Sequence, residues 1–169
     1  MPIPASFKTD RLRADKLSPA HQVDLLALHQ DRAAMAELGG IRDEAETARY
    51  LQRNVDHWAE YGFGVWMLRG LESKRSVGRI VLRWLAAEAI HDVEIGFALL
   101  REFWGRGLAT EAGHFCMRLA RFELGLETLV GATTPENRAS QNVLRKLGLR
   151  HESEVTISGT ECLLYRIRW

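Results

Sequence analysis

The segment from residue 94 to residue 112 holds the residue types whose spacing points most clearly to chemistry. An apolar run ends at Leu100, Gly105-Arg106-Gly107 follows, and a helical pattern starts at Leu108. Glycine allows unusual φ angles and leaves no Cβ in the way of a ligand. Backbone N–H groups in such a turn, together with the positive end of a helix dipole, form an anion site. The segment therefore predicts binding of a phosphate-bearing ligand, and a pyrophosphate would fit it.

Other glycine motifs explain this segment less well. Gly105 and Gly107 resemble the first two glycines of a nicotinamide dinucleotide fingerprint, and Glu127 follows about 20 residues later. Thr110 replaces the third glycine, however, and the pattern contains a single strand–helix–strand unit where a dinucleotide fold requires several. A Walker loop is excluded because the sequence has no Gly-Lys-Ser/Thr. A tight strand-to-helix turn without a ligand is the remaining alternative.

The composition favours one globular domain spanning residues 1–169. Apolar residues make up 46% of the chain and charged residues 27%, and a chain of this length buries a core without disulfides. The 23 Lys and Arg residues nearly balance the 22 Asp and Glu residues, so no global field favours nucleic acid or an anionic membrane. Met1-Pro2-Ile3-Pro4 does not start a signal peptide and no segment reaches the ~20 apolar residues of a membrane span, so we expect a cytoplasmic protein.

Cysteine and histidine spacing predicts no metal site. Cys116 and Cys162 form no Cys-x-x-Cys pair, and both are expected to be small buried apolar residues rather than reactive thiols. His91, His114 and His151 lack metal-ligand spacing and are expected at the surface.

The N-terminal part is expected to contain a strand at residues 7–12 and two helices. Ser18-Pro19 supplies a cap and a first helical proline, and Gly39-Gly40 ends that helix or a short successor. Asp43 and Glu46 form a capping box for the second helix, which Gly62 closes. The expected apolar faces are Val23, Leu26, Ala27 and Met35 in the first helix, and Ala48, Leu51, Val55 and Trp58 in the second.

The rest of the chain alternates between strand and helix patterns. The full order is β-α-α-β-β-β-α-β-α-β-β, which predicts an α+β domain with a mixed, mostly antiparallel sheet flanked by helices. One parallel pair is expected where a helix connects two strands. The expected elements are strands at 65–68, 77–85 and 93–100, a helix from Leu108 to Gly125 through Ala112, Phe115, Leu119 and Phe122, a strand at 128–133, a helix at 138–147 capped by Asn137, and a closing hairpin of 149–157 with 160–169.

Residues 94–112, followed by Asn137-Arg138-Ala139-Ser140 and Lys146-Leu147-Gly148-Leu149, resemble the GNAT superfamily of N-acetyltransferases, particularly its RimJ/RimL-like branch. The order of elements is similar to that family's fold, so the resemblance covers nearly the whole chain. It implies an acyl-CoA-dependent N-acyltransferase that moves acetyl from acetyl-CoA to a primary amine by direct attack in a ternary complex. The motif is specific for the co-substrate and does not identify the acceptor.

The resemblance also implies a role for each motif residue. The strands at 93–100 and 128–133 should splay apart, so that the pantetheine arm of coenzyme A pairs with the first strand. The implied binding residues are Phe97, Ala98 and Leu99 for the arm, Trp104, Gly105, Arg106, Gly107, Leu108, Ala109 and Thr110 for the pyrophosphate, and Asn137 on the other side of the arm. Two positions depart from the family: Trp104 stands where Gln or Arg is favoured, and Leu144 stands where a proton-donating Tyr is common.

The reaction requires a base, an oxyanion donor and a way for the thiolate to leave. Glu94 is the candidate base, projecting beside an expected bulge at Ile95-Gly96, although it could equally be a solvated strand carboxylate. Ser140 is the candidate proton donor to the sulfur, and supporting the Asn137 cap is its alternative role. A backbone N–H of Phe97 or Ala98 would stabilise the oxyanion.

The acceptor and the assembly stay open at this stage. Asp31, Glu37, Asp43 and Glu44 lie between the first two helices and would favour a cationic amine, or they form a solvated surface. A protein N-terminal amine and a small-molecule amine both fit. A non-catalytic acyl-CoA-binding domain is the alternative function, supported by Leu144 in place of Tyr. Edge strands favour a homodimer, while a monomer breaks no rule.

Overall fold

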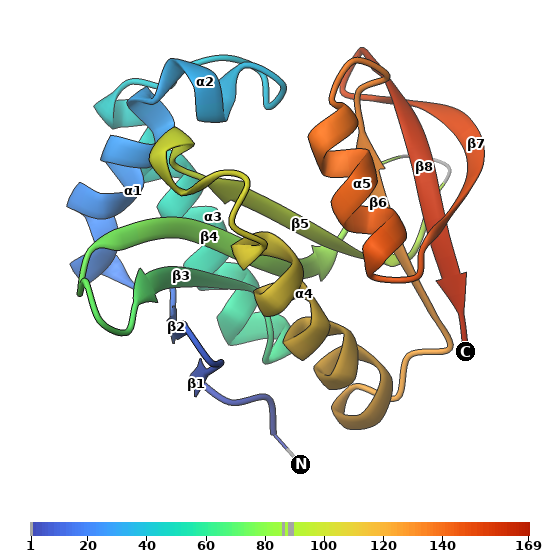
Figure 1. The fold of residues 1–169 in the computed structure, drawn as a ribbon, viewed down its shortest axis with the longest axis horizontal. Helices are drawn as coiled ribbons and strands as arrows, with labels where there is room; N and C mark the ends of the chain where they lie inside the picture. Colours follow the sequence, from blue (N-terminus) through green and yellow to red (C-terminus); the bar gives the residue numbers. More distant parts are fainter. Residues whose placement is uncertain (1, 86, 88–89) are drawn as a thin grey trace.

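The centre of the fold is one sheet in the order β1-β2-β3-β4-β5-β6-β8-β7, in a computed structural model that describes residues 2–85, 87 and 90–169 (Figure 1). Neighbouring strands are antiparallel except β5 and β6, which are parallel, so the expected mixed sheet with one parallel pair is confirmed. The strands are β1 Ser6–Lys8, β2 Leu12–Lys16, β3 Val65–Gly70, β4 Ser76–Trp84, β5 Val93–Leu99, β6 Thr128–Thr133, β7 Arg150–Ile157 and β8 Thr160–Arg168.

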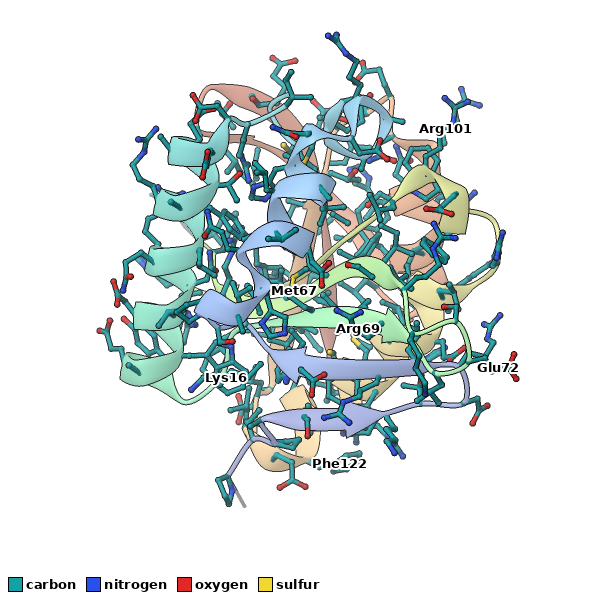
Figure 2. The ribbon with its side chains drawn as sticks, turned by 90° about the vertical axis from the view of Figure 1, so that its left-hand side faces the viewer. Lys16, Met67, Arg69, Glu72, Arg101 and Phe122 are labelled. Atoms are coloured by element: carbon teal, nitrogen blue, oxygen red, sulfur yellow. The ribbon has the colours of Figure 1, made fainter. Side chains whose placement is uncertain are left out.

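Helices cover both faces of this sheet. Tyr50 of α3 and Leu25 of α1 pack with Val65 and Val81 on one face, whereas α4 and α5 pack on the other. Figure 2, which views the molecule from the side of α1 and α3, shows these two helices in front of the strands. The helices are α1 Gln22–Gln30, α2 Arg32–Met35, α3 Glu44–Tyr61, α4 Leu108–Arg118 and α5 Arg138–Lys146, with 3-10 turns at Pro19–His21 and Arg101–Phe103 and a π-helical turn at Leu119–Glu123.

Local capping signals set several element boundaries as expected. The Asp43 carboxylate accepts a hydrogen bond from the Glu46 N–H, and the Glu46 carboxylate accepts one from the Asp43 N–H. At the other end of α3, Gly62 adopts a left-handed φ of 75°, a conformation that other residues adopt at a cost. Asn137 caps α5 by accepting from the Ser140 N–H. These side-chain contacts depend on near neighbours, which is why they could be predicted locally.

The N-terminal segment differs from the prediction of one strand. Residues 7–12 do not form a continuous strand; β1 and β2 form a short hairpin in which Phe7 lies opposite Ala14. Phe7 also stacks on Phe115 of α4, with ring centroids 4.0 Å apart. This hairpin extends the sheet past β3.

The buried faces of three helices also differ from the expected apolar stripes. In α1 the buried residues are Leu25, Leu28 and His29, whereas Val23 is 78% exposed. Two stripes of this short helix are apolar, and tertiary packing selects the leucine stripe. In α3 Leu51 and Trp58 are buried as expected, but Thr47, Tyr50 and Asn54 complete the face in place of Ala48. Phe122, expected on the inner face after α4, is 69% exposed because the π-helical turn rotates the last residues (Figure 2).

Candidate active site

A cleft of about 410 Å³ lies where β5 and β6 separate. The two strands share one register pair, Glu94 with Val130, although β5 stays fully paired with β4 on its other side. Residues of α2, α4 and α5 complete the walls; Figure 1 shows where these helices lie relative to β5 and β6. The edge of β5 that faces β6 therefore leaves backbone groups available to a ligand beyond Glu94.

The expected bulge at Ile95-Gly96 is wrong. Pairing of β4 with β5 runs without a register shift from Gly78 opposite Leu99 to Trp84 opposite Val93. The sheet opens because β6 diverges from β5, and no extra residue in β5 is needed for this. Glu94, Gly96 and Ala98 consequently share one face of a regular strand.

The glycine loop adopts the backbone conformation expected of it. Gly105 and Gly107 have φ values of 73° and 74°, and Gly107 is the N-cap of α4. A Cβ added at Gly105 would meet no atom within 4 Å, so the backbone angle, more than lack of space, favours glycine there. The unpaired N–H groups of the first turn of α4 lie at the end of this loop. The Trp104 indole donates to the Leu99 carbonyl at 2.7 Å and ties the loop to β5.

A second set of contacts, which sequence reasoning missed, fastens the same loop to the β1–β2 hairpin. Arg11 donates through Nη1 to the Arg106 carbonyl at 2.8 Å and through Nε to the Glu111 carboxylate at 2.6 Å. Glu111 also accepts from the Thr9 hydroxyl and the Arg11 N–H. Burial by itself raises the pKa of Glu111, but these hydrogen bonds outweigh it and hold the pKa below the ordinary value. About 100 residues separate the partners, so no local pattern could indicate this contact.

Of the predicted site residues, all except Arg106 line the cleft. Arg106 points its exposed guanidinium over the Phe103 ring, 5.7 Å from the centroid. Those that line the cleft are Glu94, Phe97, Ala98, Leu99, Trp104, Gly105, Gly107, Leu108, Ala109, Thr110, Asn137 and Ser140. The structure therefore brings together residues from β5, the loop, α4 and the start of α5.

The start of α5 contributes a capped turn to the cleft. Asn137 Oδ1 accepts from the Ser140 N–H at 3.0 Å, and Ser140 is half-buried at the cleft wall. Leu144, one turn further on, is buried; a Cβ on Gly131 would lie 2.5 Å from its Cδ2. Gly131 of β6 thus makes room for Leu144.

Glu94 is held by an ion pair from the neighbouring strand. Its carboxylate accepts from Arg83 Nε at 2.7 Å, and the two residues are cross-strand partners. Burial lowers the pKa of Arg83, but the Glu94 carboxylate and Tyr50 together raise it more, so the guanidinium keeps its proton. Arg79 and Val81 of β4 line the cleft on the same face as Arg83. The sequence analysis did not identify these three residues. Their positions at every second residue of a strand were the available signal that they share one face of the sheet.

The acidic residues proposed for a cationic acceptor are mostly elsewhere. Asp31 caps α2 by accepting from the Ala34 N–H, and Asp43 caps α3. Of the four residues only Glu37 lines the cleft, and its carboxylate accepts from the Thr134 hydroxyl at 2.5 Å. Asp43 and Glu44 are exposed.

Histidines and cysteines lie outside this chemistry. His91, His114 and His151 are exposed, as expected. Cys116 is fully buried, which raises the pKa of its thiol, and Cys162 is partly buried. Within residues 2–85, 87 and 90–169, no three His, Cys, Asp or Glu side chains gather as metal ligands. No helix in the described part of the chain has both the length and the apolarity to cross a membrane.

Comparison with known proteins gives one consistent family. The acetyltransferase (GNAT) domain family matches residues 11–150. An Aspergillus fumigatus protein, FsC-acetyl coenzyme A-N(2)-transacetylase, is 34% identical over 96 residues, which are 53% of this chain and 40% of that protein. An Agrobacterium tumefaciens acetyltransferase structure is 26% identical with a TM-score of 0.86, covering 100% of this chain and 96% of that one.

A more distant structure shares the fold. It is RimL, a ribosomal L7/L12 α-N-protein acetyltransferase in complex with coenzyme A, with a TM-score of 0.78 and 17% identity over 98% of this chain and 97% of that one.

Proposed function

Because the chain belongs to the GNAT acetyltransferase family, whose members carry out acyl-CoA-dependent acetylation, we propose that it moves acetyl from acetyl-CoA to a primary amine by direct attack in a ternary complex. The observation that carries the proposal is the cleft at the β5–β6 opening. The glycine loop lies at one end of it and Glu94 lines its wall on the face covered by α1 and α3. A donor and an acceptor can therefore approach one carbonyl carbon from different sides.

The coenzyme A site is proposed along β5 and the loop. The backbone of Phe97, Ala98 and Leu99 would pair with the pantetheine arm as a neighbouring strand does. Pyrophosphate oxygens would accept hydrogen bonds from N–H groups between Gly105 and Thr110, at the positive end of α4. Arg106 contributes its backbone there, since its side chain lies over Phe103. Asn137 would contact the arm from α5 while its Oδ1 caps the helix.

In the proposed reaction a C–N bond forms and the thioester C–S bond breaks. Glu94 removes the proton of the attacking ammonium, directly or through a water molecule, and Arg83 fixes the carboxylate position at 2.7 Å. A backbone N–H of Phe97 or Ala98 stabilises the oxyanion. The thiolate leaves and takes a proton from the Ser140 hydroxyl, which regains one from the second proton that the nitrogen loses as the amide forms. Because a thiol has a pKa near 8.5, departure as thiolate is tolerable and this last proton is the least critical.

The finer assignments are proposals of the same kind. We propose membership of the RimJ/RimL-like branch from the segment 104–110 and the α5 motif. We propose action in the cytoplasm, and a homodimer formed through β7, the edge strand beside β8, whose residues alternate between exposed and half-buried positions.

Titration of acetyl-CoA into the wild type, a Gly107→Trp variant and a Gly125→Trp control tests the co-substrate site. Both glycines have left-handed φ angles, but Gly125 lies outside the cleft. We expect saturable binding that only Gly107→Trp abolishes, and no binding of NAD. A folded wild type that binds NAD and not acetyl-CoA would refute the assignment.

An amine panel with thiol release as readout then tests turnover. The alternative, a non-catalytic acyl-CoA-binding domain, rests on the buried Leu144 at the position where the family often has Tyr. Binding of acetyl-CoA without thiol release for any amine would favour that alternative. Turnover of wild type that falls at least 100-fold in Glu94→Gln would support Glu94 as the base.

A further inference from the structure

A row of side chains on β4 faces the acceptor side of the cleft. Arg79, Val81 and Arg83 lie opposite Ala98, Gly96 and Glu94 of β5. Gly96 has no side chain and that of Ala98 is a single methyl group, so β5 fills little of the space above this face of the sheet. The longer side chains of β4 therefore border the open cleft. The row ends in two guanidiniums.

The two guanidiniums differ in their partners. Arg83 is paired with Glu94. Arg79 is 5% exposed and lines the cleft, yet its Nε has no hydrogen-bond partner among the described residues. The Tyr50 ring, 5.0 Å from the guanidinium carbon, is its packing contact. A buried charge without a hydrogen-bonding counter-ion is costly, so such groups generally serve a ligand or pair with one.

Among the described residues no carboxylate forms an ion pair with Arg79, although Glu94 acts on it at longer range and raises its pKa. Arg42 also lies over the Tyr50 ring, at 5.2 Å, and donates to the Leu38 carbonyl. His29 adds no charge near neutral pH, because burial and the two guanidiniums lower its pKa to about 3. The one carboxylate on this row is Glu94. Burial lowers the pKa of Arg79, but an arginine stays protonated at neutral pH.

The phosphates of coenzyme A are not the natural counter-ion. Arg79 and Val81 belong to the sheet face packed by α1 and α3, where Val81 is part of one hydrophobic cluster with Leu25 and Tyr50. The glycine loop leads into α4, whose Leu108 packs with Ile95 and Leu99 on the other face. An anion bound at the start of α4 therefore lies across the sheet from Arg79.

Building on the proposed function, we infer that the acceptor amine carries a carboxylate and that Arg79 is the residue that binds it. A guanidinium matches a carboxylate with two parallel hydrogen bonds from neighbouring N–H groups. Arg79 lines the cleft while its Nε is itself buried, so a carboxylate would reach the guanidinium through its Nη groups, and the amine end of the same molecule would face Glu94. Arg79 is thus the residue that determines specificity for an amino acid over a simple amine.

Matched substrate pairs test this inference. L-leucine, β-alanine and γ-aminobutyrate would each be compared with its primary amide in the wild type, Arg79→Met, Arg79→Lys and an Arg13→Met control. Arg13 is on β2, half-exposed and outside the cleft. We expect at least one acid to exceed its amide in kcat/KM by roughly 10- to 150-fold, the range of a charged hydrogen-bonded pair. Arg79→Met should remove this ratio, and Arg79→Lys, which keeps charge without the planar fork, should restore part of it.

A binding measurement separates this inference from the transferase assignment. Saturation-transfer NMR of the same acids and amides, with the protein saturated by coenzyme A, reports Arg79-dependent carboxylate binding whether or not turnover occurs. Retained acetyl-CoA affinity in Arg79→Met would show that the variant is folded and that Arg79 acts on the acceptor side. Equal wild-type binding and turnover of acids and amides, or an acid preference that survives Arg79→Met, would overturn the inference. Absence of turnover with carboxylate binding intact would count against the proposed reaction alone.

Discussion

Replacing Arg11 by Met removes the side-chain contacts that link the glycine loop to the β1–β2 hairpin, outside the cleft. The side chain gives two hydrogen bonds, to the Arg106 carbonyl at 2.8 Å and to the Glu111 carboxylate at 2.6 Å. Its side chain is 52% exposed, so each bond lies at the low end of about 0.5–1.5 kcal/mol. Glu111 keeps its bonds from Thr9 and from the Arg11 backbone. We therefore expect the free energy of unfolding to fall by about 1 kcal/mol.

The same loss should weaken coenzyme A binding. A loop no longer tied at the Arg106 carbonyl must be ordered when the phosphates bind, and that ordering opposes binding. If the free energy of acetyl-CoA binding becomes less favourable by the full amount of about 1 kcal/mol, the Kd for acetyl-CoA rises about 5-fold. Calorimetric titration at 25 °C measures this directly, alongside urea unfolding.

Arg13→Met is the matched control for Arg11→Met. Arg13 is on the same hairpin, its side chain is 51% exposed, and it forms a comparable ion pair with Asp15 at 2.9 Å. Among the described residues its side-chain hydrogen bonds go to Asp15 and none goes to the glycine loop. We expect a similar small loss of stability and an unchanged Kd. A Kd within 2-fold of wild type in Arg11→Met, or an equal rise in Arg13→Met, would refute the view that the hairpin preorganises the loop.

Three further substitutions probe other parts of the structure. Gly78→Ala should lower the free energy of unfolding by about 3 kcal/mol, because Gly78 has a φ of 150° and its Cβ would lie 2.1 Å from the Ala98 carbonyl oxygen; urea unfolding measures this, and a wild-type midpoint would contradict it. His29 is buried with its pKa lowered to about 3. As pH falls, the unfolded chain therefore binds a proton at this histidine before the folded chain does. The contribution of neutral His29 to stability is fully present above pH 6.5 and is lost as pH falls towards 3. Between pH 7.5 and 5.5 this effect should lower the free energy of unfolding by about 1.4 kcal/mol. The pH-dependent loss should be about 1.4 kcal/mol smaller in His29→Gln than in wild type. It should be unchanged in His114→Gln, whose imidazole is exposed. Ser140→Ala should reduce kcat by less than ~100-fold, since the Asn137 cap uses the Ser140 backbone N–H; a larger loss in a thiol-release assay would make Ser140 essential.

Much of the fold could be predicted because its signals are local. The capping box of Asp43 and Glu46 and the strands in the middle of the chain depend on residues that are close in sequence. The errors occur where local signals are ambiguous. In α1 the sequence carries two apolar stripes, and only packing against Val65 and Val81 decides that Leu25 is buried and Val23 exposed.

By itself the sequence determined the glycine loop, since left-handed φ angles at Gly105 and Gly107 are a property of the residue type. It also determined the element order, and with it which residues of β5, α4 and α5 face one cleft. Only the tertiary structure decided which side chains of β4 and of the β1–β2 hairpin join the site. Arg79 meets Ala98 through strand pairing, and Arg11 meets Glu111 across about 100 residues. Register and long-range contacts follow from the global packing of the sheet, so no local pattern in the chain contains them.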